Sequence, residues 1–185
     1  MTYQRLDLIT APASQPVTLY EVKAHTRVDF DDDDMLLVTL MDAAIEHVET
    51  ILGRQLMSAT YELHLGGFPA GNLALPRPPV SSVESVTYRD RDGTEQTFTD
   101  FLAYLDRDAP FIAPTTRWPS TQEHPDAVVV RFVAGFDEAP DRARVAILSL
   151  VSHWYDTRTP NEGNVREVPH HITRLLNSTR TWAQA

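Results

Sequence analysis

The chain has 185 residues, of which 42% are hydrophobic and 23% charged, and it carries a net charge of −10 with no cysteine. This length and composition suit one soluble globular domain, and the lack of cysteine excludes disulfides and thiolate metal sites. The acidity argues against a protein that holds nucleic acid by its phosphates, because that binding needs Lys and Arg. The first residues have no signal-peptide pattern, and no apolar run reaches the ~20 residues of a membrane span. We therefore expect a protein made in the cytoplasm without membrane attachment.

Residues 1–54 are expected to form the N-terminal helices. Thr18 and Glu21, in the stretch TLYE, make a capping box that predicts a short helix to about Thr26. The stretch DFDDDD then places five aspartates in six residues. A calcium loop needs ligands at alternating positions, a central glycine and a terminal Glu, and none of that spacing is present. We interpret Asp31 to Asp34 as residues that cap and charge the start of a second helix.

The second helix is predicted from apolar residues that recur at intervals of three and four, with Gly53 as its stop. The spacing indicates a stripe that faces the core. His47 lies off this stripe, so we expect it to face solvent. The stripe comprises Leu37, Met41, Ala44, Ile45, Val48, Ile51 and Leu52.

Residues 55–136 are expected to form an inserted, mostly antiparallel β unit. The stretch ATYELHL alternates, a second stretch predicts two strands around an Asp92-Gly93 turn, and AVVVRFVAG is a β-branched strand that ends in glycine. The stretches GGFPAGN and FIAPTTRWPSTQEHP are predicted as loops from their Gly and Pro content.

The helical period returns in residues 137–158, which predict one core helix with Pro140 in its first turn. Its apolar face contains Ile147, Leu148, Val151, Trp154 and Tyr155. Residues 159–185 then form a predicted loop and a C-terminal arm with too few apolar residues for a core of its own. The expected fold class is thus α+β, a small helical bundle with an inserted β unit, in a single domain over residues 1–185.

Catalytic motifs are absent: the chain contains no GxSxG, GxxxxGK[ST], GxGxxG or HExxH stretch. His153, Glu167, His170 and His171 can be drawn as a metal site. Adjacent histidines point in different directions in most backbone conformations, so we expect no metal, no cofactor and no catalytic residue. A small hydrolase that uses His153, His170 or His171 with Asp156 is kept as the less favoured alternative.

Three stretches in this order carry a family resemblance: LYEVKAHTRVDFDDDDMLLVTLMDAAIEHVETILGRQL, LPRPPVSSVESVTYRDRDGTE and VVVRFVAGFDEAPDRARVAILSLVSHWYDTR. Over residues 17–158 the chain resembles the head-tail connector, or adaptor, family of tailed double-stranded DNA phages, prophages and gene-transfer agents. The resemblance implies a structural, non-catalytic protein of the particle neck, made in the host bacterial cytoplasm. Such proteins form a ring, usually of twelve copies, beneath the portal, extend the DNA channel without specific DNA binding, and present a surface for a stopper or tail protein.

Under this resemblance the C-terminal arm is the expected contact with the portal protein, since Trp, Leu and Arg are typical of interfaces that order a docking segment. An arm folded back on its own domain is an equal alternative. A different neck protein, a stopper or tail terminator, would share the acidity and the lack of motifs. The predicted portal-contact residues are Arg174, Leu175, Leu176, Arg180 and Trp182.

Overall fold

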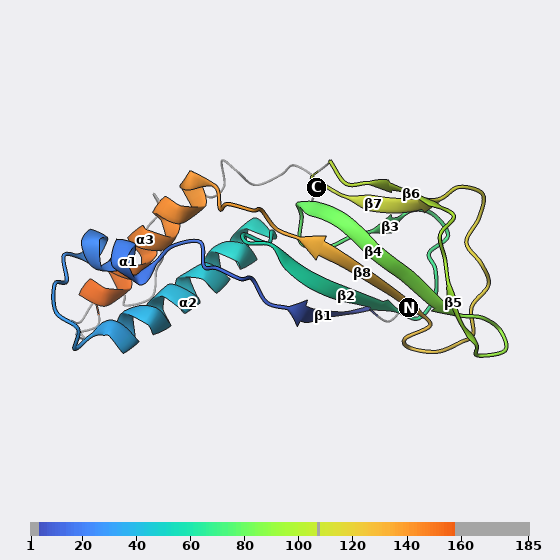
Figure 1. The fold of residues 1–185 in the computed structure, drawn as a ribbon, viewed down its shortest axis with the longest axis horizontal. Coiled ribbons are helices and arrows are strands. Elements are labelled where there is room, and N and C mark those ends of the chain that lie inside the picture. The colour runs from blue at the N-terminus through green and yellow to red at the C-terminus, as the bar shows by residue number, and fades with distance from the viewer. Residues whose placement is uncertain (1–3, 107, 158–185) are drawn as a thin grey trace. The chain divides into compact units, whose positions relative to one another are not determined.

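The computed structural model describes residues 4–106 and 108–157, which contain three helices and eight strands (Figure 1). The predicted α+β class, a helical bundle with an inserted antiparallel β unit, is confirmed. The described residues separate into two compact units. A helical unit comprises residues 14–56 and 138–157, and a β unit comprises residues 4–13 and 57–137. The assignment of residues 1–185 to a single domain stays a prediction.

The helical unit consists of α1 (Leu19–Thr26), α2 (Asp34–Leu52) and α3 (Asp141–Asp156). The predicted capping box is confirmed, because the Thr18 hydroxyl accepts from the Glu21 N–H at 3.2 Å and the Thr18 N–H donates to the Glu21 carboxylate at 2.7 Å. Helix α2 ends at Gly53, whose φ of 61° is left-handed, as a glycine stop requires. No helix in the described ranges is long and apolar enough to cross a bilayer.

The predicted core stripe of α2 is largely confirmed. Leu37, Met41, Ala44, Val48 and Leu52 are buried against α1 and α3, while Ile45 and Ile51 are half-buried at the edge of this core. The expectation that His47 faces solvent is wrong. Its ring meets the Trp154 ring edge to face, with the centroids 6.0 Å apart.

The aspartates before α2 start the helix where predicted, but their assigned role as caps is wrong. The N-cap residue Asp33 makes no side-chain cap bond. Its carboxylate instead accepts a hydrogen bond from the Tyr155 hydroxyl of α3. The Lys23 ammonium on α1 lies 2.6 Å from the Asp31 carboxylate and 2.8 Å from that of Asp34. The carboxylates therefore join the start of α2 to α1 and α3.

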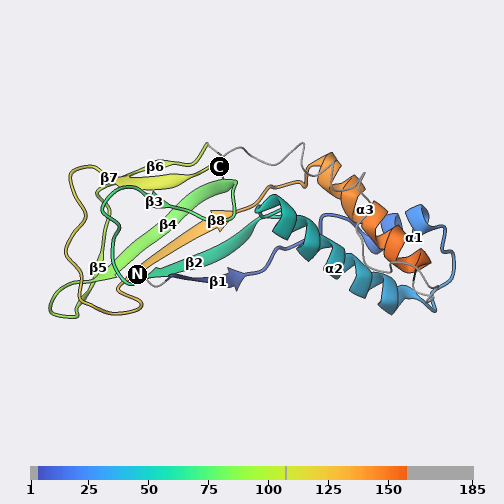
Figure 2. The same cartoon turned by 180° about the vertical axis from the view of Figure 1, so that it is seen from behind.

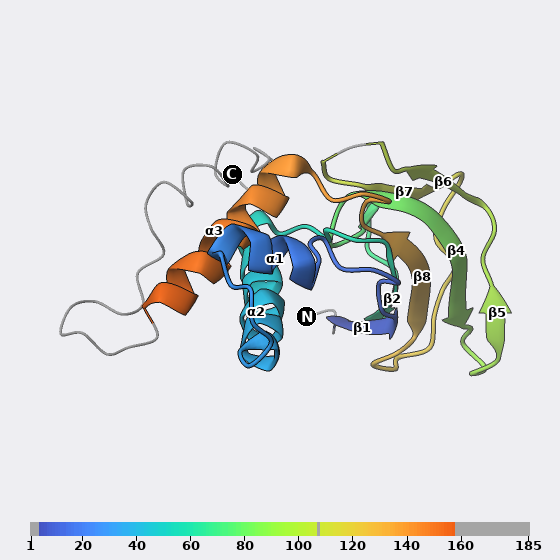
Figure 3. The same cartoon turned by 60° about the vertical axis from the view of Figure 1, so that its left-hand side comes forward.

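The larger sheet of the β unit has the strand order β1-β2-β8-β4-β5, and all neighbours are antiparallel (Figures 2 and 3). Its strands are β1 (Gln4–Thr10), β2 (Ala59–Leu65), β8 (Val128–Ala134), β4 (Val80–Arg89) and β5 (Glu95–Thr97). Alternate residues of β2 and β8 are buried, as their period of two predicted. The predicted Asp92-Gly93 turn joins β4 to β5, and Gly93 has the positive φ of 82° that this turn uses.

The smaller sheet has the order β3-β7-β6, formed by β3 (Leu73–Ala74), β7 (Phe111–Pro114) and β6 (Phe101–Tyr104). Ile112 and Leu73 of this sheet share one buried core with Val130 and Phe132 of the larger sheet. One face of the larger sheet is therefore packed, and its other face carries the polar residues of the alternating strands.

Four observed strands were not expected: β1, β3, β6 and β7. β1 lies in residues 1–54, where we expected only helices, and it pairs with β2 rather than with a neighbour in sequence. β7 occupies the first four residues of FIAPTTRWPSTQEHP, a stretch predicted as a loop, and β6 pairs with it. Each is a short or edge strand, so its partner in the sheet decides its conformation more than its own sequence does.

Candidate functional site

The five predicted portal-contact residues lie outside the described residues, and so do Glu167, His170 and His171. The structure therefore does not test them. His153 and Asp156 both lie in the last turns of α3, and within the described chain no hydrogen bond or ion pair joins them. Among residues 4–106 and 108–157, no group of three or more His, Asp or Glu side chains is arranged to hold a metal ion.

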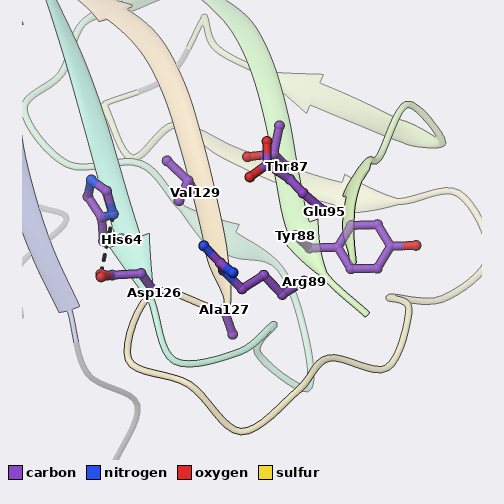
Figure 4. A pocket seen from close by; sticks show the side chains of 8 residues that line it. All are labelled: His64, Thr87, Tyr88, Arg89, Glu95, Asp126, Ala127 and Val129. Atoms are coloured by element: carbon purple, nitrogen blue, oxygen red, sulfur yellow. Dashed lines mark ion pairs between the residues drawn. The ribbon is translucent and has the colours of Figure 1, made fainter. Parts of the chain in front are cut away.

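The polar face of the larger sheet contains one charged cluster, centred on His64 of β2 (Figure 4). The imidazole Nδ1 lies 3.4 Å from the Asp126 carboxylate, and Nε2 lies 3.4 Å from Asp7 and 3.7 Å from Glu62. Arg131 forms a 2.7 Å ion pair with Glu62 across the β2–β8 pairing. His64 is only 9% exposed, so three carboxylates surround a nearly buried imidazole.

A cavity of about 230 Å³ adjoins this cluster, and the Arg89 side chain extends from β4 toward the His64–Asp126 pair (Figure 4). Thr87 is a hydroxyl residue in the lining, and in the described structure it makes no hydrogen bond to His64. A hydroxyl nucleophile needs such a bond to an imidazole base. The arrangement therefore brings β1, β2 and the segment before β8 together around one imidazole, and it does not assemble a nucleophilic triad. The sequence analysis missed this cluster, whose only local signal is a His at an outward position of ATYELHL.

A second charged network joins the three helices. The Arg144 guanidinium of α3 binds the Glu21 carboxylate of α1, the same group that completes the capping box. The Thr18 N–H, followed by the Thr18 hydroxyl and Arg144, lowers the pKa of Glu21 below its usual 4.5. The hydrogen bond to Asp31 raises the pKa of Lys23, and the same bond lowers the pKa of Asp31. These contacts join α1 to α3 through Glu21 and α1 to the start of α2 through Lys23.

We expect Glu21→Gln to reduce the free energy of unfolding by about 1 kcal/mol at pH 7. Glutamine can still accept the hydrogen bond from the Thr18 N–H, but it lacks the negative charge that strengthens the contacts of Glu21 with Thr18 and Arg144. Since the folded state lowers the pKa of Glu21, its stabilisation is complete above pH 4.5 and is lost as the pH falls through the folded value. Urea unfolding of both proteins at pH 7 and pH 3 measures this. The difference in the free energy of unfolding between the wild type and Glu21→Gln should be smaller at pH 3 than at pH 7. An equal difference at both pH values would contradict the assignment.

Comparison with known proteins identifies the family. The sequence matches the model of the head completion protein family over residues 16–181, so the chain belongs to this family. The resemblance to head-tail connectors is thereby confirmed. No curated protein matches the chain.

The structure is also similar to chains of solved particles. One comes from the neck of an empty gene transfer agent (GTA) particle computed with C6 symmetry, with a TM-score of 0.79, 23% identity, and coverage of 96% of this chain and 95% of that one. A second comes from the virion of a native GTA particle, with a TM-score of 0.79, 22% identity and 95% coverage of both chains. A third comes from the neck of a native GTA particle computed with C12 symmetry, with a TM-score of 0.76, 22% identity, and coverage of 96% and 95%. At these identities the likeness shows a shared fold.

Proposed function

We propose that this chain is a structural head-tail connector in the neck of a phage or phage-like particle, and that it is not an enzyme. The observation that carries the proposal is the match to the head completion protein family, which spans residues 16–181 and so takes in both units. The fold supports it, because chains of similar fold occur in neck structures of gene transfer agent particles with C6 and C12 symmetry.

The proposed assembly is a ring of twelve copies that lies beneath the portal, with a stopper or another neck protein below. Identical copies in a ring contact one another through two different surfaces, so closure depends on a fixed rotation, which the portal can supply as a template. The net charge of −10 suits a channel wall through which DNA passes without being held. Contact with the portal is assigned to the C-terminal arm, through Arg174, Leu175, Leu176, Arg180 and Trp182.

Deleting the gene in a particle-producing strain tests the connector role. We expect DNA-filled heads without tails by negative-stain electron microscopy, and tailed particles again when the full chain is supplied from a plasmid. Supplying the His153→Ala, Asp156→Asn double variant separates the structural role from the hydrolase alternative. A connector should restore tails with this variant as well as with the wild-type chain. Tailed particles in the deletion strain would contradict the proposal, and a double variant that folds but restores no tails would favour the hydrolase.

A further inference from the structure

The cavity of about 230 Å³ beside His64 is lined by side chains from neighbouring strands of the larger sheet. Thr87 and Arg89 come from β4, Glu95 from β5 and Val129 from β8. A water molecule in the liquid takes up about 30 Å³, so the cavity has more room than one or two waters need. It can therefore hold a small organic molecule.

Two opposite charges in this lining have no partner among the described residues. Arg89 and Glu95 lie opposite each other in the β4–β5 pairing, where side chains of opposite charge usually interact. No hydrogen bond or ion pair joins either side chain to any group in the described chain, and Arg89 extends toward the His64–Asp126 pair instead (Figure 4). Asp126, the other carboxylate of the lining, lies 3.4 Å from His64 and 3.7 Å from the Arg5 guanidinium. The charges left uncompensated are thus one guanidinium and one carboxylate.

The backbone that carries both charges is fixed by hydrogen bonds. The Asp90 carboxylate, in the turn between β4 and β5, accepts from the Asp92 and Thr94 N–H groups, each at 3.0 Å. The Arg89 N–H donates to the Ala127 carbonyl at 2.8 Å, which ties the end of β4 to the segment before β8. A ligand of this cavity would consequently bind with little ordering of the main chain, and that lowers the entropic cost of binding.

The charges of the lining select among classes of ligand. An anion would be attracted by Arg89 but repelled by Glu95 and Asp126, and a cation would be attracted by the carboxylates but repelled by Arg89. A molecule that carries one carboxylate and one ammonium group complements both charges. Val129 adds an apolar part to the lining, which suits an aliphatic group on the same molecule.

We propose that this cavity binds a free aliphatic α-amino acid in its zwitterionic form. The Arg89 guanidinium binds the α-carboxylate, the Glu95 carboxylate binds the α-ammonium group, and Val129 contacts the aliphatic side chain. The site lies within the β unit and goes beyond the connector role, on which it does not depend.

NMR titration of the isotope-labelled full chain tests the class of ligand. L-Leucine should shift the amide signals of Arg89, Ala127 and Val129. It should also bind at least tenfold more tightly than isocaproate, which lacks the ammonium group, and at least tenfold more tightly than isoamylamine, which lacks the carboxylate. The comparison uses the wild-type chain alone, so it does not depend on whether a variant folds.

Two variants assign each charge of the ligand to its partner. Arg89→Gln should bind L-leucine and isoamylamine equally, because the ligand carboxylate has lost its partner. Glu95→Gln should bind L-leucine and isocaproate equally, because the ammonium group has lost its partner. The matched controls are Arg91→Gln and Glu84→Gln, which change exposed residues outside the lining and should keep the tenfold preferences of the wild type.

Three results would overturn the proposal. The first is the absence of amide shifts in the wild type at tens of millimolar L-leucine. The second is equal affinity of the wild type for L-leucine, isocaproate and isoamylamine, which would show that the charges do not select the ligand. The third is a full preference for L-leucine in folded Arg89→Gln and Glu95→Gln, which would place the ligand elsewhere.

Discussion

Replacing Gly135 by alanine should destabilise the β unit by on the order of 4 kcal/mol, at the upper end of single-residue effects. A Cβ at this position would lie 2.3 Å from the Met57 carbonyl oxygen and 2.8 Å from the Ser58 nitrogen. These are backbone atoms, which cannot move aside as a flexible side chain can. The residue also has a φ of 111°, which side chains rarely adopt.

The backbone around Gly135 is fixed on both sides, which removes the route by which the clash would relax. The Gly135 N–H donates to the Pro79 carbonyl at 2.8 Å, and the Ser58 N–H donates to the Phe136 carbonyl at 2.9 Å. Urea unfolding combined with hydrogen exchange of the β8 amides measures the effect within the β unit. Gly71→Ala is the matched control, because nothing lies within 4 Å of its added Cβ, and it should change stability by less than ~0.5 kcal/mol. Similar stability for the two variants would contradict this account.

Deleting residues 161–185 should leave the protein folded, with a melting temperature within about 2 °C of the full chain, and abolish tail attachment to portal-bearing heads. The core that the structure describes in the helical unit uses residues from Val17 to Tyr155, all of which the deletion keeps. The run TPNEGNVREVPHH has too little apolar surface to offset an ordering cost of ~1 to 2 kcal/mol per residue. Leu175, Leu176 and Trp182 can bind only where they meet an apolar groove.

Differential scanning fluorimetry and counts of tailed particles by electron microscopy check the truncation. In the full-length chain, the double change Leu175→Asp, Leu176→Asp should also leave heads without tails, while the polar change Ser178→Ala in the same segment should not. An unfolded truncated protein would place the arm in the core and move the portal contact to another surface. A truncated protein that folds and still gives tailed particles would show that the arm is not the anchor.

For the aspartates before α2, the local sequence predicts where the helix begins but not which groups their side chains bind. The DFDDDD stretch correctly placed a helix start, since α2 begins at Asp34. Its side chains nevertheless bind Lys23 on α1 and Tyr155 on α3 rather than the first turn of α2. A carboxylate at a helix start has several partners within reach, and only the packing of the bundle selects among them.

Among the strands, too, local sequence predicts some and only pairing in the sheet decides the others. The alternation of ATYELHL and AVVVRFVAG identified β2 and β8, because successive side chains of a strand point to opposite faces and the pattern is therefore visible within the segment alone. FIAP looked like a loop because it ends in proline and is followed by polar residues, yet pairing with β3 and β6 makes it the central strand of the smaller sheet. β1 is likewise a strand through its pairing with β2.

The sequence by itself determined the three helices, the capping box of α1, the glycine stop of α2, the main strands and the hairpin at Asp92-Gly93, because periodicity and turn chemistry act within about ten residues. The connector resemblance came separately, from three stretches in a fixed order. It also determined the acidity that argues against DNA binding. Only the tertiary structure decided which strands are edges, which carboxylates surround His64 and why Gly135 cannot carry a side chain. Each of these depends on contacts between segments far apart in the chain, such as β1, β2 and the residues before β8. Such contacts arise from packing and main-chain pairing, which no local pattern specifies.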